Sequence, residues 1–467
     1  MRGKLFLFGT GKISKRYTEL FKQISVEIVG YIDNDREKWG TYFYGKKVDG
    51  PQKLLQEKDP DIFIACSAQD EISIQLSEMN LEKCIVSMNQ IIDISDKSVI
   101  DNIMLKNLML DRCREKSIII DNLNGKWGGA EDWSHIMVSA LAERGYDVYV
   151  VEHTKQPPAE GLEKNTLYIT MDEENEYCIY SELIKLLMIR RPFILFNVKN
   201  SELLWAAVTI KQRYPKESFI VSSILNDAIY DKFCEWDDHI DLYLCISSRI
   251  QENLVHLYHV DRRKVHCRTP FIEKIRIINK IYSIENDKPL KVGYPCRLIA
   301  YQKRADMIPK LIMYLEQNNV NYVLNIAGDG PCEIMINEFV ESNQLHSKVK
   351  MYGRLSRTEL YDFLDEQDVY LNISEFEGTS LTMLEAMASG CVPVVTNVSG
   401  VSDFIENRIN GFTVNVGDLE KISEHIAFLD HNRYMLAKYG GKSMQIVQEK
   451  CRLSEYIDDI EEIIKFV

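Results

Sequence analysis

The feature that most restricts the fold of this chain is the alternation of apolar runs with amphipathic segments. It occurs in three stretches, from Lys4 to about residue 92, from Ser117 to about residue 275, and from near Leu290 onward. The apolar runs are short enough for buried strands, and the segments between them have the period of helices. Such alternation predicts parallel sheets with helices on both faces. We therefore expect an α/β protein built from Rossmann-like domains.

The length of the chain requires more than one core, because 467 residues exceed the usual domain size of about 100–200 residues. We expect a small Rossmann-like domain at 1–95 and a polar, helical connector at 96–115. A second domain follows at 116–275, and a third at 276–467. The last segment, Leu453–Val467, has Ile457, Ile460, Ile463 and Ile464 on one side. It is therefore expected to be an amphipathic helix, one that can cross back to the second domain.

The amino-acid composition limits the classes of partner and the cellular compartments that we expect for this protein. A formal net charge of -14 argues against nucleic acid, whose phosphates require an excess of Lys and Arg. The eleven cysteines contain no C-x-x-C pair, which is typical of a reducing cytoplasm and offers neither a zinc site nor a disulfide framework. No window has the ~20 apolar residues of a membrane span, and the N-terminus lacks a signal peptide. We expect a cytoplasmic protein, with the basic segments 189–191 and 261–264 as candidates for peripheral membrane contact or simply for a solvated surface.

The sharpest local signal is the segment from Glu377 to Glu385. A strand is predicted to end at Ile373, and Thr379 or Ser380 is a suitable N-cap for the helix that follows. The free N–H groups at the start of that helix, with the helix dipole, predict an anion site. A carboxylate beside such a site repels a phosphate unless it faces hydroxyl groups. The two glutamates therefore predict contacts with sugar and ribose hydroxyls.

Two cations are expected at the same edge of the sheet. Arg297 and Lys303 follow the first strand of the third stretch. The carboxyl ends of parallel strands meet at one edge, where ligands of such folds bind. Two fixed cations there can hold a diphosphate and stabilise the negative charge that develops on it during bond cleavage.

These residues carry a resemblance to a known family. Residues 117 to about 450 resemble the GT-B glycosyltransferases of family 4, the retaining group with two glutamates separated by seven residues. Such enzymes have two doubly wound Rossmann-like domains that face a cleft. The matching marks, in the family's order, are Gly128-Gly129-Ala130-Glu131, Arg297 with Lys303, Ala327 to Pro331, Tyr352-Gly353, Glu377-Gly378, Glu385 to Gly390, and Asn410-Gly411-Phe412.

The resemblance also implies the roles of individual residues. Arg297 and Lys303 would hold the diphosphate, Glu377 the hydroxyls of the donor sugar, and Glu385 the ribose. The turn at Gly378 and the amides from Thr379 to Leu381 would contact the distal phosphate. Gly128 and Gly129 would let the backbone of the second domain approach the same group, and the loop near Gly353 would flank the base. The implied site residues are Arg297, Lys303 and Glu377 for catalysis, and Gly128, Gly129, Gly353, Gly378, Thr379, Ser380, Leu381 and Glu385 for substrate binding.

The implied reaction moves a sugar from a nucleotide diphosphate sugar, with uridine as the common base. Transfer keeps the anomeric configuration and needs no divalent metal or other cofactor, since the two cations replace the metal. The acceptor would be a glycan or a lipid-linked molecule in cell-surface polysaccharide or glycoconjugate synthesis. Many relatives carry a histidine near the donor sugar, whereas this chain has Lys199-Asn200 and Asn226-Asp227 at the two candidate places.

The first domain has its own nucleotide pattern. Gly9 and Gly11 follow a strand and open a helix, and Asp33 comes about twenty residues later. Ser14 replaces the third glycine of the dinucleotide fingerprint. The segment resembles small Rossmann-like domains of sugar acyltransferases. NAD or another nucleotide at Gly9, Gly11 and Asp33 is one hypothesis, and a role in oligomerisation or docking is another.

Two further functions compete with sugar transfer. An NAD-dependent sugar-nucleotide oxidoreductase or epimerase would need a Tyr-x-x-x-Lys helix or a comparable proton-transfer pair after the fingerprint, and we expect none in residues 40–95. A non-catalytic glycosyltransferase-like subunit would not need a complete site. The presence of Arg297, Lys303, Glu377 and Glu385 together argues against a decayed site.

Overall fold

A computed structural model describes most of the chain, namely residues 4–66, 68–88, 90–91, 116–122, 129–153, 161–169, 179–198, 200–226, 230–273, 280–285 and 287–466. The connector expected at 96–115 lies outside these residues. The chain forms two compact units, each described by itself below. One consists of Met1–Ser222 with Glu235–Asp241, and the other of Ser223–Cys234 with Leu242–Val467.

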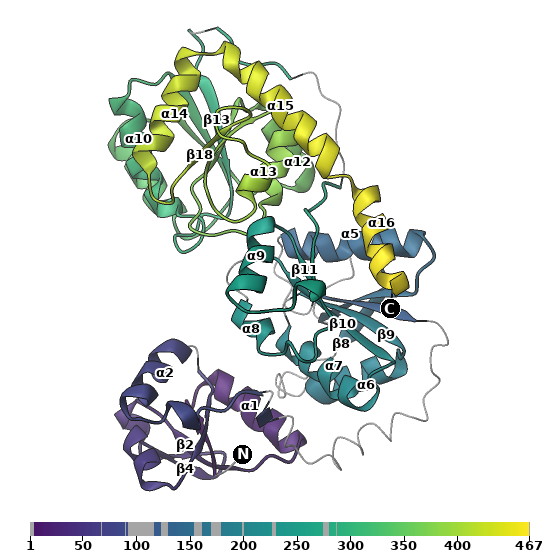
Figure 1. The fold of residues 1–467 in the computed structure, drawn as a ribbon. Coiled ribbons are helices and arrows are strands. Elements are labelled where there is room, and N and C mark those ends of the chain that lie inside the picture. The colour runs from purple at the N-terminus through teal and green to yellow at the C-terminus, as the bar shows by residue number, and fades with distance from the viewer. Residues whose placement is uncertain are drawn as a thin grey trace. The chain divides into compact units, whose positions relative to one another are not determined.

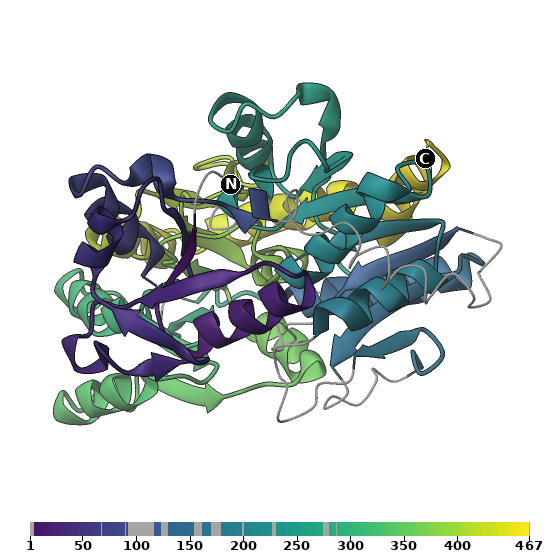
Figure 2. The same cartoon turned by 90° about the horizontal axis from the view of Figure 1, so that it is seen from below.

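The predicted α/β class is confirmed by three sheets whose strands pair in parallel, apart from one antiparallel hairpin. The first sheet has the order β3-β4-β2-β1-β5. In Figure 2, helix α1 lies along the strands of this sheet, all drawn in purple. The elements are β1 Leu5–Phe8, α1 Lys12–Gln23, β2 Ile28–Ile32, β3 Tyr42–Phe43, β4 Lys46–Asp49, β5 Asp61–Ile64 and α2 Gln69–Glu78.

The hairpin β3–β4 bears on the oxidoreductase hypothesis. The sequence Tyr42-Phe-Tyr-Gly-Lys46 does spell Tyr-x-x-x-Lys, but Tyr42 lies on β3 and Lys46 on β4. The two residues therefore do not share the helical face that the proton-transfer pair would need.

The second sheet has the order β12-β11-β10-β9-β6-β7-β8. Its first strand, β6, ends at Asp121, where the sequence predicted an apolar run to Leu123. The elements are β6 Ser117–Asp121, α5 Gly129–Glu143, β7 Val148–His153, β8 Thr166–Ile169, α6 Ile179–Ile189, β9 Phe193–Asn197, α7 Ser201–Arg213, β10 Ser218–Ile224, α8 Tyr230–Cys234, β11 Leu242–Cys245, α9 Ser248–His256 and β12 Val265–Cys267.

The third sheet is wholly parallel, with the order β15-β14-β13-β16-β17-β18. Figure 1 shows its helices, among which α10 and α14 lie side by side. The elements are β13 Leu290–Pro295, α10 Ile308–Gln317, β14 Tyr322–Ala327, α11 Glu333–Ser342, β15 Val349–Gly353, α12 Arg357–Glu366, β16 Val369–Asn372, α13 Leu381–Ala388, β17 Val392–Thr396, β18 Phe412–Val414, α14 Leu419–His431, α15 Tyr434–Lys450 and α16 Leu453–Phe466.

Two apolar clusters fix this third sheet between its helices. One includes Leu311 of α10, Ile336 of α11 and Ile426 of α14. The other includes Leu364 of α12 and Met387 of α13. The helices thus cover the sheet in two separate layers, as a doubly wound fold requires.

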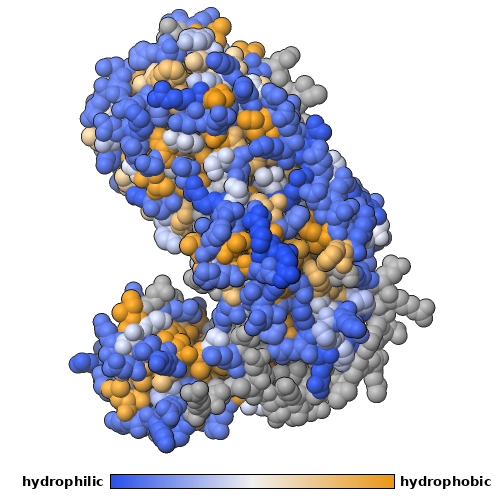
Figure 3. All heavy atoms as spheres, in the orientation of Figure 1, coloured by the Kyte–Doolittle hydropathy of each residue, from blue (hydrophilic) through white to orange (hydrophobic). Residues whose placement is uncertain are grey.

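The outer surface of these helices is mostly polar. On the face seen in Figure 3, apolar residues of this region appear only as small separate spots. Within the part of the chain that the structure describes, no helix combines the length and the apolar character needed to span a bilayer.

Candidate active site

The candidate site lies where two neighbouring strands of the third sheet end. Strand β13 pairs in parallel with β16, and their carboxyl ends lead into the loops that carry Arg297 and Glu377. The two loops are joined by the Glu375 amide, which donates to the Gln302 carbonyl over 2.8 Å. Arg297, Lys303 and Glu377 are therefore brought to one edge of the sheet, as the strand order predicted.

An ion pair stands at the centre of this edge. The Lys303 ammonium contacts Glu377 Oε1, and both side chains are largely buried. The same oxygen accepts from the Ser374 hydroxyl over 2.8 Å, and Gln302 Nε2 donates to Glu377 Oε2 over 3.3 Å. Arg297 donates to Gln302 Oε1 over 3.2 Å. The two predicted cations thus differ, because Lys303 pairs with a carboxylate while Arg297 contacts a neutral amide.

Glycines of the segment 328–330 hold the Arg297 loop in place, a role that the sequence did not reveal. Gly328 has a positive φ of 134°, and a Cβ there would lie 1.8 Å from the Cys296 carbonyl oxygen. The Leu298 amide donates to the Asp329 carbonyl over 2.8 Å. The two loops can approach this closely only because no side chain stands between them.

Helix α13 begins as predicted. Ser380 is the N-cap, and its hydroxyl accepts from the Met383 amide. Leu381 is the first helical residue, so the N–H groups that follow the cap have no acceptor within the helix. Gly390, with a φ of 74°, follows the last turn. The site therefore has the amide end of a helix beside two cations, which favours an anionic ligand.

The turn before α13 is tightly packed. A Cβ on Gly378 would lie 1.9 Å from the Leu225 carbonyl oxygen of the same unit. The Thr379 hydroxyl donates to the Ile246 carbonyl over 2.8 Å. Position 378 therefore requires glycine for lack of space.

Glu385 is held by two residues that sequence reasoning missed. It is buried, with 3% of its surface exposed. Arg357 Nη2 lies 2.9 Å from Glu385 Oε1, and the Tyr361 hydroxyl donates to the same oxygen over 3.4 Å. Both partners are one turn apart on α12. Burial raises the pKa of Tyr361 to about 12, and the Glu385 carboxylate adds to this, so the phenol stays a donor.

Gly353 ends β15 beside the end of β14. Its φ is 65°, and its carbonyl accepts from the Gly328 amide over 2.7 Å. Within the described residues, nothing lies within 4 Å of a Cβ built there. The positive φ explains the glycine, and its position beside the base stays a prediction.

The Cys296 thiol lies close enough to Lys303 and Arg297 to feel their charge. Burial raises its pKa to about 11, although Lys303 acts in the opposite direction. The side chain therefore stays a neutral thiol at physiological pH and is unsuited to be a nucleophile.

The structure describes only some of the residues predicted to bind the substrate from the second domain. Gly128, Lys199 and Asp227 lie outside the described residues, and Gly129 begins α5. Asn200 is the N-cap of α7, where its side chain accepts from the Leu203 amide over 2.6 Å. Its role at that position is structural.

A pair between the half-buried His135 and the buried Glu152 also lies in this domain. His135 Nε2 is 2.6 Å from Glu152 Oε1, which also accepts from Asn122 over 2.9 Å. Burial acts to raise the pKa of Glu152, but these hydrogen bonds outweigh it and the pKa is lowered. These contacts give His135 a structural role at the end of β7.

The basic segment 189–191 is not a free basic face. Arg191 is buried, with 1% exposed, and it pairs with Glu217 at 3.0 Å. Its guanidinium lies over the Tyr214 ring at 3.7 Å. The charge of Arg191 therefore cannot contribute to a membrane-facing patch.

The loop after β1 has the predicted glycine turn, and its acidic residue already has partners. Gly9 has a φ of 114°. Asp33 Oδ2 accepts from the Thr10 hydroxyl and from Lys38, the latter over 3.2 Å. Ser14, in the place of the third glycine, has its hydroxyl 2.6 Å from the Gly9 carbonyl and 3.0 Å from that of Ala65. Thr10 and Lys38 thus occupy Oδ2 of Asp33, and the Asp35 amide donates to Oδ1 over 2.9 Å.

Comparisons with known proteins show which families and folds this chain resembles. Residues 278–444 match the family described as Glycosyl transferases group 1, and residues 1–92 match a separate one, C2185-like, N-terminal. Poly(ribitol-phosphate) alpha-N-acetylglucosaminyltransferase of Staphylococcus aureus is 26% identical over 34% of this chain and 32% of its own length. One subunit of human phosphatidylinositol N-acetylglucosaminyltransferase is 23% identical over 64% of this chain and 66% of its own. The chain thus spans about one third to two thirds of these relatives.

Solved structures show the same fold. Anabaena HepE in complex with UDP-glucose superposes with a TM-score of 0.60 and 15% identity, over 76% of this chain and 100% of that protein. At such low identity the likeness concerns the fold alone.

Proposed function

We propose that the protein transfers a sugar from a nucleotide diphosphate sugar, because residues 278–444 match the family of glycosyl transferases group 1 and the fold is that of GT-B glycosyltransferases. A UDP-sugar is the favoured donor, and a glycan or a lipid-linked molecule is the acceptor. The curated relatives described above act on a ribitol-phosphate polymer and on phosphatidylinositol, with N-acetylglucosamine as the sugar. UDP-N-acetylglucosamine is therefore the first donor to test.

One observation carries the proposal. Positive charge at this sheet edge comes from Arg297, Lys303 and the amide end of α13. Glu377 pairs with Lys303, and Glu385 lies within α13. A diphosphate matches the positive groups, and its sugar and ribose hydroxyls match the carboxylates. The leaving diphosphate gains negative charge as the sugar departs, and preorganised cations stabilise that charge.

The same residues suggest how the reaction proceeds. With two cations on the diphosphate, we propose that no divalent metal is needed. We propose that the acceptor attacks from the face that the diphosphate leaves, with retention of configuration, and the Cys296 thiol, whose pKa is raised to about 11, offers no nucleophile for a covalent alternative. Activity in the presence of EDTA tests the first point, and the anomeric configuration of the product tests the second.

Binding of a nucleotide diphosphate tests the site. We expect UDP to raise the melting temperature of the wild type, and Arg297→Ala or Glu385→Ala to abolish the shift. Lys310→Ala, at an exposed position of α10, is the matched control and should retain it. Undiminished shifts in both site variants would show that the nucleotide binds elsewhere. Hydrolysis of UDP-N-acetylglucosamine by the wild type then separates an enzyme from a protein that only supports a catalytic partner.

A further inference from the structure

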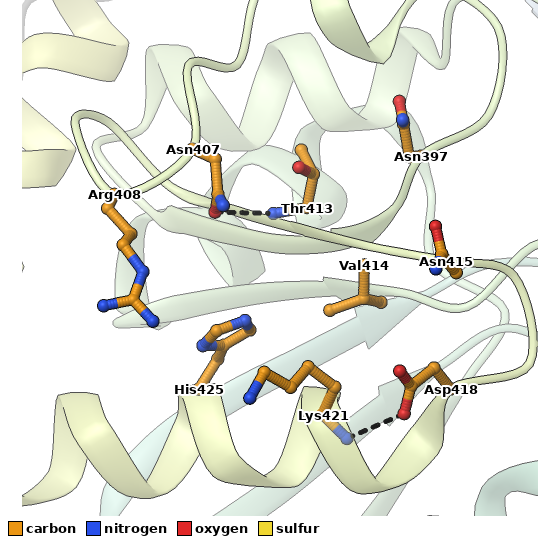
Figure 4. A pocket seen from close by; sticks show the side chains of 9 residues that line it. All are labelled: Asn397, Asn407, Arg408, Thr413, Val414, Asn415, Asp418, Lys421 and His425. Atoms are coloured by element: carbon orange, nitrogen blue, oxygen red, sulfur yellow. Dashed lines mark hydrogen bonds between the residues drawn. The ribbon is translucent and has the colours of Figure 1, made fainter.

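A second polar pocket lies in the same unit and shares no residue with the candidate active site. Its volume is about 310 Å³, and it lies between β18 and the first turns of α14. Figure 4 shows the side chains around it. The lining residues are Asn397, Asn407, Arg408, Thr413, Val414, Asn415, Asp418, Lys421 and His425.

The charged side chains of this pocket are two cations, Arg408 and Lys421, and one carboxylate, Asp418. In Figure 4, Arg408 and Lys421 extend toward His425 from two sides. No ion pair engages Arg408 within the described ranges, whereas Lys421 pairs with Glu424. The carboxylate of Asp418 caps α14, where it accepts from the Lys421 amide over 3.1 Å. The amide end of this helix of 13 residues offsets part of that negative charge.

His425 is an independent sign of a ligand. It is buried, with 5% exposed, and its ring stacks on Phe412 with the centroids 4.4 Å apart. Among the residues that the structure describes, no group forms a hydrogen bond with its ring nitrogens. The ring lines the pocket, so its nitrogens are within reach of a ligand bound there.

The pKa of His425 reports the potential at the ring. Burial lowers it, and the positive charges of Lys421 and Arg408 lower it further, against the opposing effect of Glu424 and Asp418. The ring therefore lies in a positive field, which disfavours a cation and favours an anion in the pocket.

We propose that this pocket binds a phosphate group. Arg408 and Lys421 would supply charge-assisted hydrogen bonds, and the neutral His425 ring would donate its single N–H. The volume exceeds that of a phosphate alone and leaves room for the alcohol of a phosphate ester. The assignment is separate from the donor site and does not depend on the proposed function.

The test uses the full chain with Arg297→Ala, so that the donor site contributes little to phosphate binding. Inorganic phosphate is added while the ring signals of the histidines are followed by NMR, with His425 assigned by His425→Gln. We expect the His425 signals to move in a saturable way. Arg408→Ala should weaken this binding about tenfold, because an exposed cation is lost without disturbing the core. Lys438→Ala, an exposed lysine of α15 outside the pocket, should leave it unchanged.

A second arm separates a soluble phosphate from a lipid headgroup. Flotation with vesicles of phosphatidylglycerol, against phosphatidylcholine alone, measures binding to the membrane. The proposal is supported if Arg408→Ala weakens binding of inorganic phosphate or binding to phosphatidylglycerol vesicles. Which of the two is weakened identifies the source of the phosphate. Absence of binding in both arms, or binding that Arg408→Ala leaves unchanged, would overturn the proposal.

Discussion

Glu377→Gln is expected to change nucleotide binding and sugar transfer in opposite directions. In the structure Lys303 is paired with Glu377, and both side chains are largely buried. A diphosphate held by Lys303 would share that ammonium with the carboxylate. Glutamine keeps an acceptor oxygen for Lys303 and Ser374 but removes the negative charge.

The size of the effect follows from the shared cation. Two anions that contact one ammonium lie about 5 Å apart, and their repulsion is about 1 kcal/mol in a water-like medium and about 3 kcal/mol at an effective dielectric constant of about 20. UDP should therefore bind Glu377→Gln at least about fivefold more tightly than the wild type. Transfer from the UDP-sugar should instead fall about tenfold or more, because the charged acceptor for the sugar hydroxyls is lost.

Isothermal titration with UDP and an assay of sugar transfer measure the two effects. Glu375→Gln is the matched control, since Glu375 lies in the same loop and pairs with Arg304, and it should leave UDP binding unchanged. Equal or weaker binding of UDP to Glu377→Gln would refute the shared-cation reasoning. So would an equal gain in the Glu375→Gln control.

Three other perturbations test separate parts of the structure. Arg357→Ala removes the cation beside buried Glu385 and should weaken UDP binding about tenfold by titration, whereas unchanged binding would argue against Glu385 as the ribose contact. Gly328→Ala places a Cβ 1.8 Å from the Cys296 carbonyl oxygen and should lower the free energy of unfolding in urea by about 3 kcal/mol, and a wild-type value would contradict the close approach. Glu152 has a lowered pKa, so its stabilising effect is present at neutral pH and is lost as the pH falls through that value. Glu152→Gln should therefore lower the melting temperature more at pH 7 than near pH 4, and a constant difference would contradict this.

Apolar runs in the sequence indicate several strands of the third sheet, whereas its shortest strand carries no such signal. The apolar runs Tyr322–Ala327 and Val392–Thr396 are strands β14 and β17 with the same bounds. Strands β12 and β18 have three residues each, too few to show a period. The pocket beside β18 therefore could not be predicted from hydrophobic periodicity, although the sequence contains its basic residues. The predicted domain boundaries stay a prediction.

Side-chain partners were the part of the site that the sequence could not supply. The carboxyl ends of parallel strands meet at one edge of a sheet, which is why the sequence predicted that Arg297, Lys303 and Glu377 lie together. That prediction needs only the topology of the sheet. Arg357 belongs to a helix after a different strand, and its ion pair with Glu385 arises from the packing of α12 against α13. No local sequence pattern predicts such a contact between two helices. The roles assigned to these residues stay predictions until ligand binding is measured.

The ion pairs indicate how a site can be stable when empty and still accept an anion. A buried carboxylate without a cation is costly, and here both glutamates have one. Arg297 contacts only the neutral Gln302 among its described side-chain partners, so a phosphate can take this cation without breaking an ion pair. We expect the donor to break the ion pair between Lys303 and Glu377. Its phosphate would then bind Lys303, and its sugar hydroxyls would bind Glu377. That exchange is the reason why loss of the charge on Glu377 should help a nucleotide without its sugar and impair the complete donor.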